Sequence, residues 1–403
     1  MIRRFPLDVW AYFLSRFCAA TALTLMRATV AWHVFELSRS PFYLGLIGLV
    51  QFVPAFSLLL VGGMVADRYE RRRIVMIAQL VPLAGALLLA RLTATEAATL
   101  SSLYAVVFAM AGAAAFDNPA RASLLPNLVP TADFPRAVTV ASTVQALAFA
   151  SGPAASGMII AAAGVAAAYA AVAVLLVVAI VALMQVRPSW PQGTGSTMGW
   201  QAMVQGVRFV ASRPVVWGCM LLDMLAVIFG GAAALLPVYA NEILQVGPRG
   251  YGILSASLEV GALSTSLTLM LLPPIRRAGR ALLVAVAVFG VATIVFGFSR
   301  WFPLSVAAYM LAGMADQISV VMRSTIVQLN TPDHLRGRVS AINFMFINAS
   351  NQLGAVESGF VAALTSPTFS VVSGGVGCLL VVAAVARRVP ALRNYVIRGE
   401  VRP

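Results

Sequence analysis

Long apolar runs recur along the whole chain, separated by short stretches rich in arginine, proline or glycine. Of the 403 residues, 60% are hydrophobic and only 10% are charged, whereas soluble domains carry roughly 25% charged residues. Roughly 20 apolar residues in a helix cross a hydrocarbon core about 30 Å thick, and many of the runs reach that length. The pattern predicts an all-α membrane protein that crosses the bilayer many times.

The charged residues, prolines and glycines between the runs divide the chain into twelve predicted membrane-spanning helices. They are expected at 9–36, 42–66, 73–92, 98–122, 134–160, 165–186, 214–240, 250–273, 280–299, 302–328, 337–362 and 367–388. Gly164 alone separates the fifth helix from the sixth. The first run is interpreted as a spanning helix and not as a signal peptide, because it is long and contains Arg16 and Arg27.

The basic residues are all arginine, and the net charge is +14. Nucleic-acid binding proteins are also basic, but here the arginines form clusters between apolar runs and not one continuous face. Arginine-rich loops stay on the cytoplasmic side of a membrane. With both termini inside, the outer loops hold only Arg39, Arg91, Arg249 and Arg300, and 22 of the 28 arginines face the cytoplasm. We therefore expect cytoplasmic termini, contact with the lipid bilayer and no nucleic-acid partner.

Residues for catalysis or metal binding are scarce. Cys18, Cys219 and Cys378 lie within apolar runs, where they are interpreted as small packing residues. His33 and His334 are far apart in sequence, and the absence of lysine excludes a phosphate-binding G-x-x-x-x-G-K-[ST] motif. We expect no enzymatic activity, no metal and no cofactor.

The middle of the chain differs from the rest. A Pro/Gly/Ser-rich stretch follows Arg187, and Trp200, Met203 and Val207 then recur at helical spacing, which indicates a short helix on the cytoplasmic membrane surface. The predicted organisation is an N-terminal six-helix bundle over 1–188, a cytoplasmic linker with an interfacial helix over 189–213, a C-terminal six-helix bundle over 214–390 and a cytoplasmic tail over 391–403.

The two halves are related in sequence. The segment RASLLPNLVPTADFPRAV from Arg121 aligns without a gap with RSTIVQLNTPDHLRGRVS from Arg323, at an offset of 202 residues. A weaker similarity pairs SPFYLG at Ser40 with GPRGYG at Gly247. Chance similarity between apolar sequences is the alternative, but the matched residues are polar or proline. A parallel duplication of six helices is typical of one large class of transporters.

The stretch GGMVADRYERRR, from Gly62 to Arg73, falls between the second and third predicted helices. It resembles the major facilitator superfamily signature G-x-x-x-D-R-x-G-R-R, with Glu70 where many members have glycine. The matching residues are Gly63, Asp67, Arg68, Arg71 and Arg72. Together with PARASLLPNLVP, LLPVYANEIL, GPRGYGIL and PDHLRGRVSAIN, it resembles the branch of enterobactin and other siderophore exporters, the transmembrane secretion effector type. The resemblance covers nearly the full chain. It implies two pseudo-symmetric six-helix bundles in a bacterial cytoplasmic (inner) membrane.

This loop is interpreted as a conformational latch. Gly63 would let two helices approach closely, and Asp67 would face the positive N-terminus of a neighbouring helix. The resemblance implies that this neighbour is the eleventh helix, near Leu335 to Val339. The latch is expected to consist of Gly63, Asp67, Arg68, Arg71, Arg72, Arg323 and Arg336. An ordinary arginine-rich inner loop is the alternative, but it explains neither Gly63 nor Asp67.

The fifth predicted helix contains ASGPAASG, from Ser151 to Gly157. It resembles the exporter motif G-x-x-x-G-P-x-x-G-G of the superfamily at Gly152, Pro153 and Gly157, and departs from it at Ala148 and Ser156. The resemblance implies an antiporter or exporter. An ordinary kinked helix is the alternative.

Charged side chains in the middle of a membrane cost about 2.5–3.5 kcal/mol on insertion scales, so each is a functional candidate. Five such residues are selected as candidates for the substrate or proton path: Arg27, Asp223, Glu259, Asp316 and Glu357. Glu259 and Asp316 are the leading candidates for proton carriers, and Arg27 for a contact with an acidic group of the substrate or with an internal carboxylate. Fixed internal ion pairs are the alternative. Arg16 is expected to extend to the inner headgroups.

These observations predict a monomeric secondary transporter that exports a small amphipathic molecule, such as a siderophore or a drug, by proton antiport with alternating access. The alternatives are an importer or proton-independent facilitator of the same fold, and a flippase for a lipid-like substrate. A membrane enzyme would need a set of catalytic residues that this sequence does not show, and a receptor would not need acids at mid-bilayer.

Overall fold

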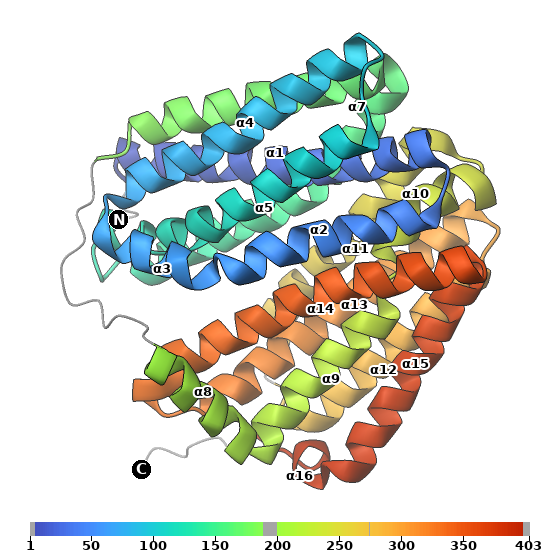
Figure 1. Cartoon of the computed structure of the whole chain (residues 1–403). Coiled ribbons are helices and arrows are strands. Elements are labelled where there is room, and N and C mark those ends of the chain that lie inside the picture. The colour runs from blue at the N-terminus through green and yellow to red at the C-terminus, as the bar shows by residue number, and fades with distance from the viewer. Residues whose placement is uncertain (1–4, 188–199, 274, 398–403) are drawn as a thin grey trace. The chain divides into compact units, whose positions relative to one another are not determined.

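The computed structural model describes residues 5–187, 200–273 and 275–397. Within these ranges it consists of helices and short connections, without a strand (Figure 1). The predicted all-α class is therefore confirmed. The predicted interfacial helix falls on α8, whereas most of the linker before it lies outside the described residues.

The helices follow the predicted order. The first half contains α1 (Leu7–Ser38), α2 (Pro41–Ser57), α3 (Leu59–Arg68), α4 (Arg71–Ala94), α5 (Leu100–Ala122), α6 (Leu125–Leu128) and α7 (Phe134–Met184). The second half contains α8 (Trp200–Ser212), α9 (Pro214–Gly230), η1 (Ala232–Leu235), α10 (Leu236–Val238), η2 (Tyr239–Ile243), α11 (Gly247–Leu271), α12 (Ala278–Phe298), α13 (Phe302–Leu329), η3 (Asp333–Leu335), α14 (Arg336–Leu364), α15 (Pro367–Arg388) and α16 (Pro390–Arg393).

Nine described segments are long and apolar enough to cross a membrane. One of them, α7, has 51 residues, and Gly164 inside it has φ 82°, a left-handed conformation that glycine adopts without strain. The helix axis breaks there, so α7 accounts for both the fifth and the sixth predicted helices. A second break, at Leu58, divides the second predicted helix into α2 and α3. The arrangement fits the predicted twelve crossings.

Contacts within the chain define two compact units. Unit 1 comprises 1–39, 49–197 and 246–256, and unit 2 comprises 40–48, 198–245 and 257–403. In unit 1, α1 packs along α7, and α4 packs against both α5 and α7 (Figure 1). Tyr12, Val75 and Leu124 are fully buried where α1, α4 and the end of α5 meet.

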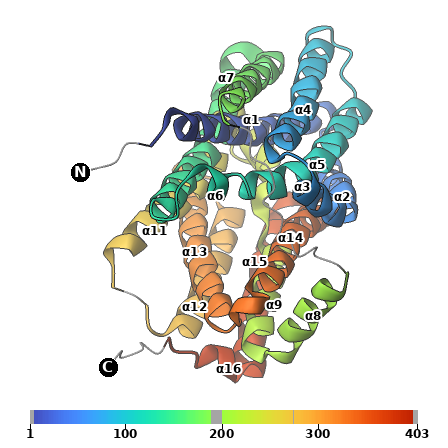
Figure 2. The ribbon, with the colours of Figure 1, turned by 90° about the vertical axis from the view of Figure 1, so that its left-hand side faces the viewer.

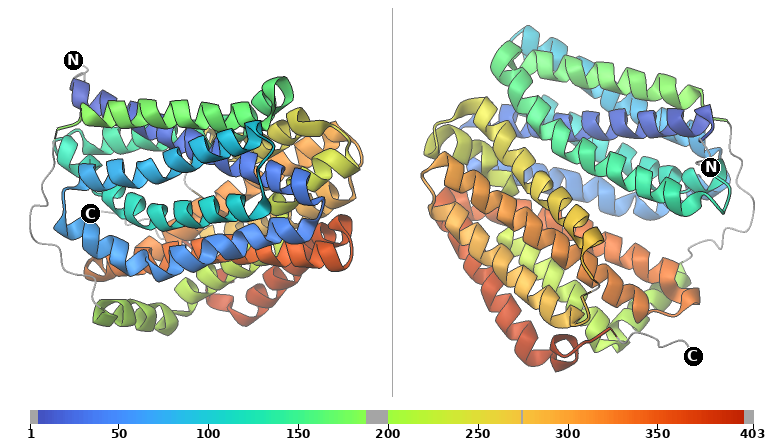
Figure 3. Two further views of the ribbon diagram at one scale, coloured as in Figure 1. Left: turned by 45° about the horizontal axis from the view of Figure 1, so that its top comes forward. Right: turned by 180° about the vertical axis from the view of Figure 1, so that it is seen from behind.

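Unit 2 has a core of its own. Its helix α12 packs against α13 and α15, and α9 packs against α14 and α15 (Figure 2). Figure 3 shows the same helices from two further directions. Cys219, Ile326 and Cys378 are fully buried in this core, which confirms that two of the three cysteines are packing residues.

Two helix beginnings belong to the unit of the opposite sequence half: the start of α2 is in unit 2, and the start of α11 is in unit 1. In unit 2, a Cβ atom added to Gly45 would lie 3.0 Å from the Cα atom of Gly359. In unit 1, a Cβ atom added to Gly252 would lie 2.8 Å from the Cα atom of Gly157. Both helices therefore cross their neighbour where two glycines meet.

Candidate functional site

Asp223 on α9 and Arg323 on α13 form an ion pair inside unit 2. Their side chains are 8% and 5% exposed, so both charges are removed from solvent and depend on each other. The sequence predicts Asp223 in the substrate or proton path and Arg323 in the latch. In this structure the two residues instead neutralise one another, as the alternative of a fixed internal ion pair describes.

Glu259 on α11 and Asp316 on α13 lie close to a helix crossing in unit 2. A Cβ atom added to Gly261 would contact the carbonyl oxygen of Met310, and one added to Gly313 would contact the carbonyl oxygen of Leu258. The two helices therefore touch backbone to backbone beside the two acids, which are both half-buried.

The carboxyl groups of Glu259 and Asp316 are near enough to repel each other when both are ionised. Within the described ranges, neither forms an ion pair with an arginine. The arrangement thus differs from that of Asp223, and it can exchange a proton without breaking an ion pair. The structure brings together the two acids that sequence analysis selected as proton carriers.

Arg27 occupies an unusual position on α1. Its side chain is exposed, whereas Met26 and Ala28 on either side are buried by the neighbouring helices. Among the described residues no carboxylate pairs with it. An arginine in contact with lipid at this depth is costly. Its guanidinium thus has no acidic partner among the described residues, and an anionic group of a cargo would supply one.

Glu357 on α14 is half-buried, and its carboxylate accepts a hydrogen bond from the hydroxyl of Ser358 at 3.3 Å. No ion pair joins it to another described residue. His33 is buried on α1, and its Nδ1 atom lies 3.1 Å from the hydroxyl of Tyr169 on α7.

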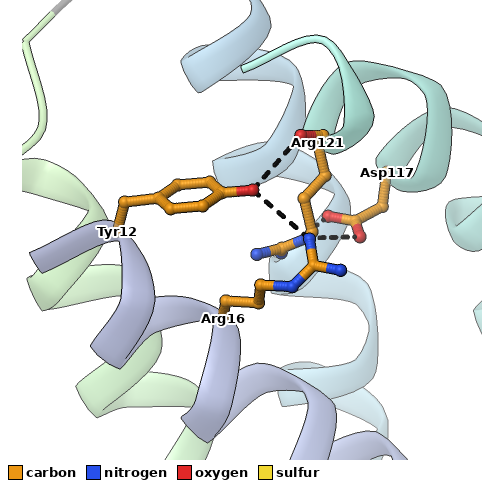
Figure 4. Close-up of polar contacts among 4 residues, drawn as sticks. All are labelled: Tyr12, Arg16, Asp117 and Arg121. Carbon is orange, nitrogen blue, oxygen red and sulfur yellow. Dashed lines mark hydrogen bonds and ion pairs between the residues drawn. The ribbon is translucent and has the colours of Figure 1, made fainter. Parts of the chain in front are cut away.

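A polar network in unit 1 was missed by sequence analysis (Figure 4). On α5, Arg121 makes two hydrogen bonds of 3.0 Å to the carboxylate of Asp117, one from Nε and one from a terminal nitrogen. From α1, Tyr12 donates to the carbonyl oxygen of Arg121 at 3.5 Å, and Arg16 donates to the hydroxyl of Tyr12 at 3.3 Å. Arg16, expected to extend to the headgroups, joins this network instead.

The internal repeat could have identified this network, because it matches Arg121 with Arg323. The two halves neutralise the matched arginines differently. Arg121 pairs with Asp117 one turn earlier on its own helix, and Arg323 pairs with Asp223 on another helix. The spacing of four residues between Asp117 and Arg121 is also a recognisable helical ion-pair pattern.

The first five residues of the predicted latch lie on α3 and the start of α4 in unit 1, whereas Arg323 and Arg336 lie on α13 and α14 in unit 2. Arg71 donates to the carbonyl oxygen of Ser123 at 3.1 Å, and Arg72 donates to that of Val186. These two arginines therefore connect the start of α4 to the ends of α5 and α7. Arg68 is exposed, and the side chain of Asp67 is outside the described part of the chain.

Glu70 in the loop of unit 1 and the latch residue Arg336 in unit 2 each have a local partner. Glu70, the departure from the superfamily signature, is buried and forms an ion pair of 2.6 Å with Arg73. Arg336 forms an exposed ion pair of 3.0 Å with Asp333, three residues before it. Each pair is local in sequence, so neither connects distant parts of the chain.

The expected close approach at Gly63 is corrected by the structure. No described atom lies within 4 Å of a Cβ atom added there, whereas one added to Gly62 would contact the carbonyl oxygen of Ala115 on α5. The signature glycine therefore has space, and its neighbour makes the close helix contact.

This difference predicts opposite effects of two adjacent substitutions. Gly63→Ala will leave the thermal unfolding temperature unchanged or raise it, because alanine favours a helix by about 1 kcal/mol over glycine. Gly62→Ala will lower it, because the added Cβ forces α3 away from α5. Thermal unfolding of both purified variants in one detergent checks the prediction. Equal stability of the two would contradict it.

The motif on the fifth predicted helix lies at two close contacts of α7. A Cβ atom added to Gly152 would lie 2.9 Å from the backbone nitrogen of Leu25 on α1. One added to Gly157 would lie 2.5 Å from the Cα atom of Gly252 on α11. Pro153 is inside the helix between them. The motif thus permits α7 to pack tightly against two helices.

Comparison with known proteins identifies the class. Solved structures with the same fold include the nucleoside transporter NupG, with a TM-score of 0.72 at 12% identity over 95% of this chain and 99% of that one. The peptide transporter POT has a TM-score of 0.77 at 13% identity, covering 98% and 97%. At these identities the likeness shows that the chain shares the fold of these structures.

The chain belongs to the transmembrane secretion effector family, whose family model matches residues 9–396. Among curated relatives, enterobactin exporter EntS of Escherichia coli (strain K12) is 24% identical over 385 residues, which covers 96% of this chain and 92% of that protein. EntS of Shigella dysenteriae serotype 1 has the same identity and coverage. The protein is thus a multi-pass membrane transporter for a small molecule.

Proposed function

We propose that the protein exports a small amphipathic molecule across the bacterial inner membrane in exchange for protons. The observation that carries this proposal is the pair of acids Glu259 and Asp316 beside the crossing of α11 and α13, without an arginine partner in the described ranges. Two neighbouring carboxyl groups are more easily occupied by one proton than left doubly charged. Protonation of this pair then changes the preference between two conformations of the transporter.

The bundles over 1–188 and 214–390 are the elements that we expect to alternate, with both termini in the cytoplasm and the chain as a monomer. The cargo is proposed to be a siderophore-like molecule, because the curated relatives are named enterobactin exporters. The exposed guanidinium of Arg27 suits an acidic or phenolic group of such a cargo. The close packing of α7 at Gly152 and Gly157 supports the interpretation of this helix as an exporter motif.

The proton gradient supplies enough energy for this function. A proton that moves through a force of about 150 mV releases roughly 3.5 kcal/mol. At about 1.4 kcal/mol per tenfold ratio, one proton sustains a cargo gradient of a few hundredfold.

Transport into inverted membrane vesicles tests the proposal, with enterobactin as the probe. The wild type will accumulate enterobactin when the vesicle interior is acidified, and an uncoupler will abolish this accumulation. Glu259→Gln and Asp316→Asn will each reduce gradient-driven accumulation at least about tenfold, because an amide cannot carry the proton. Glu242→Gln, which removes an exposed acid without an ion-pair partner among the described residues, is the matched control.

The same experiment separates the alternatives. Enterobactin accumulation that is unaffected by both the uncoupler and the two substitutions would identify a proton-independent facilitator. Uptake into right-side-out vesicles and not into inverted ones would identify an importer. Movement of a fluorescent phospholipid between leaflets without enterobactin transport would identify a flippase. Each of these results would overturn proton-driven export.

A further inference from the structure

A pocket of about 170 Å³ lies at one end of unit 2, away from the buried charges. It is formed by the start of α12, by α16 and by the residues after α16. The residues that line it are Arg277, Arg280, Arg393, Asn394, Tyr395 and Val396. Among the described residues, its lining thus includes three arginines and no carboxylate.

The fold holds this pocket together through backbone contacts. A Cβ atom added to Gly279 would contact the carbonyl oxygen of Leu392, so glycine allows the tail to lie directly on the first turn of α12. The backbone nitrogen of Gly279 donates a hydrogen bond of 3.2 Å to the carbonyl oxygen of Tyr395. The backbone nitrogen of Ile397 donates one of 2.8 Å to the carbonyl oxygen of Arg276. These contacts place Arg393 beside two arginines that are more than a hundred residues away in sequence.

Side chains reinforce the same arrangement. Leu392 is fully buried in the core of unit 2, and the side-chain nitrogen of Asn330, at the end of α13, donates to the hydroxyl of Tyr395 at 2.9 Å. The tail is therefore attached to α12 and α13 on both sides of Arg393. The chain segments that line the pocket are therefore held in place by packing and hydrogen bonds.

The charges of the pocket are not balanced within the described chain. Arg277, Arg280 and Arg393 are all exposed, and none forms an ion pair with a described residue. Arginine presents a planar set of donors that matches the oxygens of a phosphate group. Three such side chains around one small pocket indicate a site for a phosphate anion.

The position of the pocket indicates where the phosphate comes from. Arg277 and Arg280 are at the beginning of the membrane-spanning helix α12, and Arg393 follows the end of the membrane-spanning helix α15. Residues at such helix ends lie at the depth of the lipid headgroups. By the arginine count, this is the cytoplasmic end, where basic pockets beside transmembrane helices bind anionic headgroups.

We propose that this arginine pocket binds the phosphate group of an anionic phospholipid of the inner leaflet. The site is separate from the acids and arginines assigned to transport, so the proposal does not depend on the cargo or on proton coupling. General attraction between arginines and an anionic surface predicts no preference for these three residues over other exposed arginines. A specific site predicts that these three arginines matter more than other exposed arginines.

Native mass spectrometry of the full-length protein in detergent tests the site. The protein is mixed with equal amounts of phosphatidylglycerol and phosphatidylcholine that have the same acyl chains. We expect one retained phosphatidylglycerol per wild-type protein, and about tenfold weaker retention in the variant R277Q/R280Q/R393Q. The control R187Q/R208Q/R213Q removes the same charge from exposed positions outside the pocket, including one on α8, and will retain the lipid.

Size-exclusion profiles and unfolding temperatures of both variants confirm that they are folded, which exposed Arg→Gln changes allow. Equal retention by the wild type and the pocket variant would overturn the site. Equal loss in the pocket variant and the control would reduce it to general surface attraction. Displacement of the lipid by inorganic phosphate at the same concentration would reassign the pocket to free phosphate and overturn the lipid assignment.

Discussion

Replacement of Arg323 with alanine will lower the free energy of unfolding by about 3–5 kcal/mol, because it leaves the carboxylate of Asp223 buried without its partner. The side chains of the pair are only 5% and 8% exposed, so water cannot replace the lost guanidinium. The loss will appear as a lower unfolding temperature of the purified protein in a fixed detergent, and as a smaller monodisperse yield.

Arg336→Ala is the matched control, since it removes an arginine whose pair with Asp333 is exposed at both ends. Its cost will not exceed about 1 kcal/mol, as is usual for surface ion pairs. If Arg323→Ala is no more destabilising than Arg336→Ala, the buried pair does not stabilise the fold.

The double variant D223N/R323Q separates stability from transport. It removes both charges together, so most of the stability lost in Arg323→Ala will return. Normal enterobactin transport by this variant would assign the pair to structure alone. A stable double variant without transport would return Asp223 to the transport path that sequence analysis proposed.

The helices themselves could be predicted from local sequence. Charged residues and glycine mark where a spanning helix ends, because a polar or unpaired backbone group is costly in lipid. The twelfth predicted helix, 367–388, matches α15 at both ends. Gly164 was also predicted as a division, and it takes the positive φ that breaks α7. In these cases the information lies within a few residues.

The partners of the buried charges could not be predicted, because they depend on contacts between distant segments. Nothing local distinguishes Asp223, which has an arginine partner, from Glu259, which faces another acid. Both are single acids in apolar runs. The assignment of Gly63 failed for a related reason. Two adjacent glycines lie on different sides of a helix, and the sequence does not show which side packs against α5.

The sequence could also not predict that the starts of α2 and α11 belong to the unit of the opposite half. The weak similarity of SPFYLG and GPRGYG nevertheless marks these two segments. Gly45 and Gly252 occupy the same place in these two segments. Their partners, Gly359 and Gly157, are themselves separated by the repeat offset of 202 residues. An internal duplication therefore predicts that the two crossings behave alike when either is changed.

Substitution of alanine at Gly157 or at Gly359 will reduce transport at least about tenfold. At Gly157 the added Cβ would lie 2.5 Å from both the Cα atom of Gly252 and the carbonyl oxygen of Pro248. At Gly359 it would lie 2.5 Å from the backbone nitrogen of Gly45 and 2.9 Å from the carbonyl oxygen of Pro41. These are backbone atoms on both sides, so the helices themselves must separate.

Gly112→Ala on α5 is the control, because its Cβ would lie at ordinary contact distances from two side chains, 3.5 Å from Leu58 and 4.0 Å from Pro54. All three substitutions improve helix propensity equally, so a loss in the first two alone must come from the crossings. Enterobactin transport into inverted vesicles provides the measurement. A tenfold loss in Gly112→Ala as well would show that α-helical glycines are sensitive for another reason.

The conformational consequence can be measured at Ala28, which is buried and whose carbonyl oxygen accepts a hydrogen bond of 3.0 Å from Tyr251 on the exchanged start of α11. A cysteine at this position, in a chain without its three native cysteines, will be labelled slowly by a membrane-impermeant thiol reagent. Gly157→Ala loosens the crossing that holds Tyr251 in place, so labelling will become faster from the side predicted to be periplasmic. If transport falls while labelling stays slow, the glycine contact is needed for folding or cargo binding, and not to close this end of the transporter.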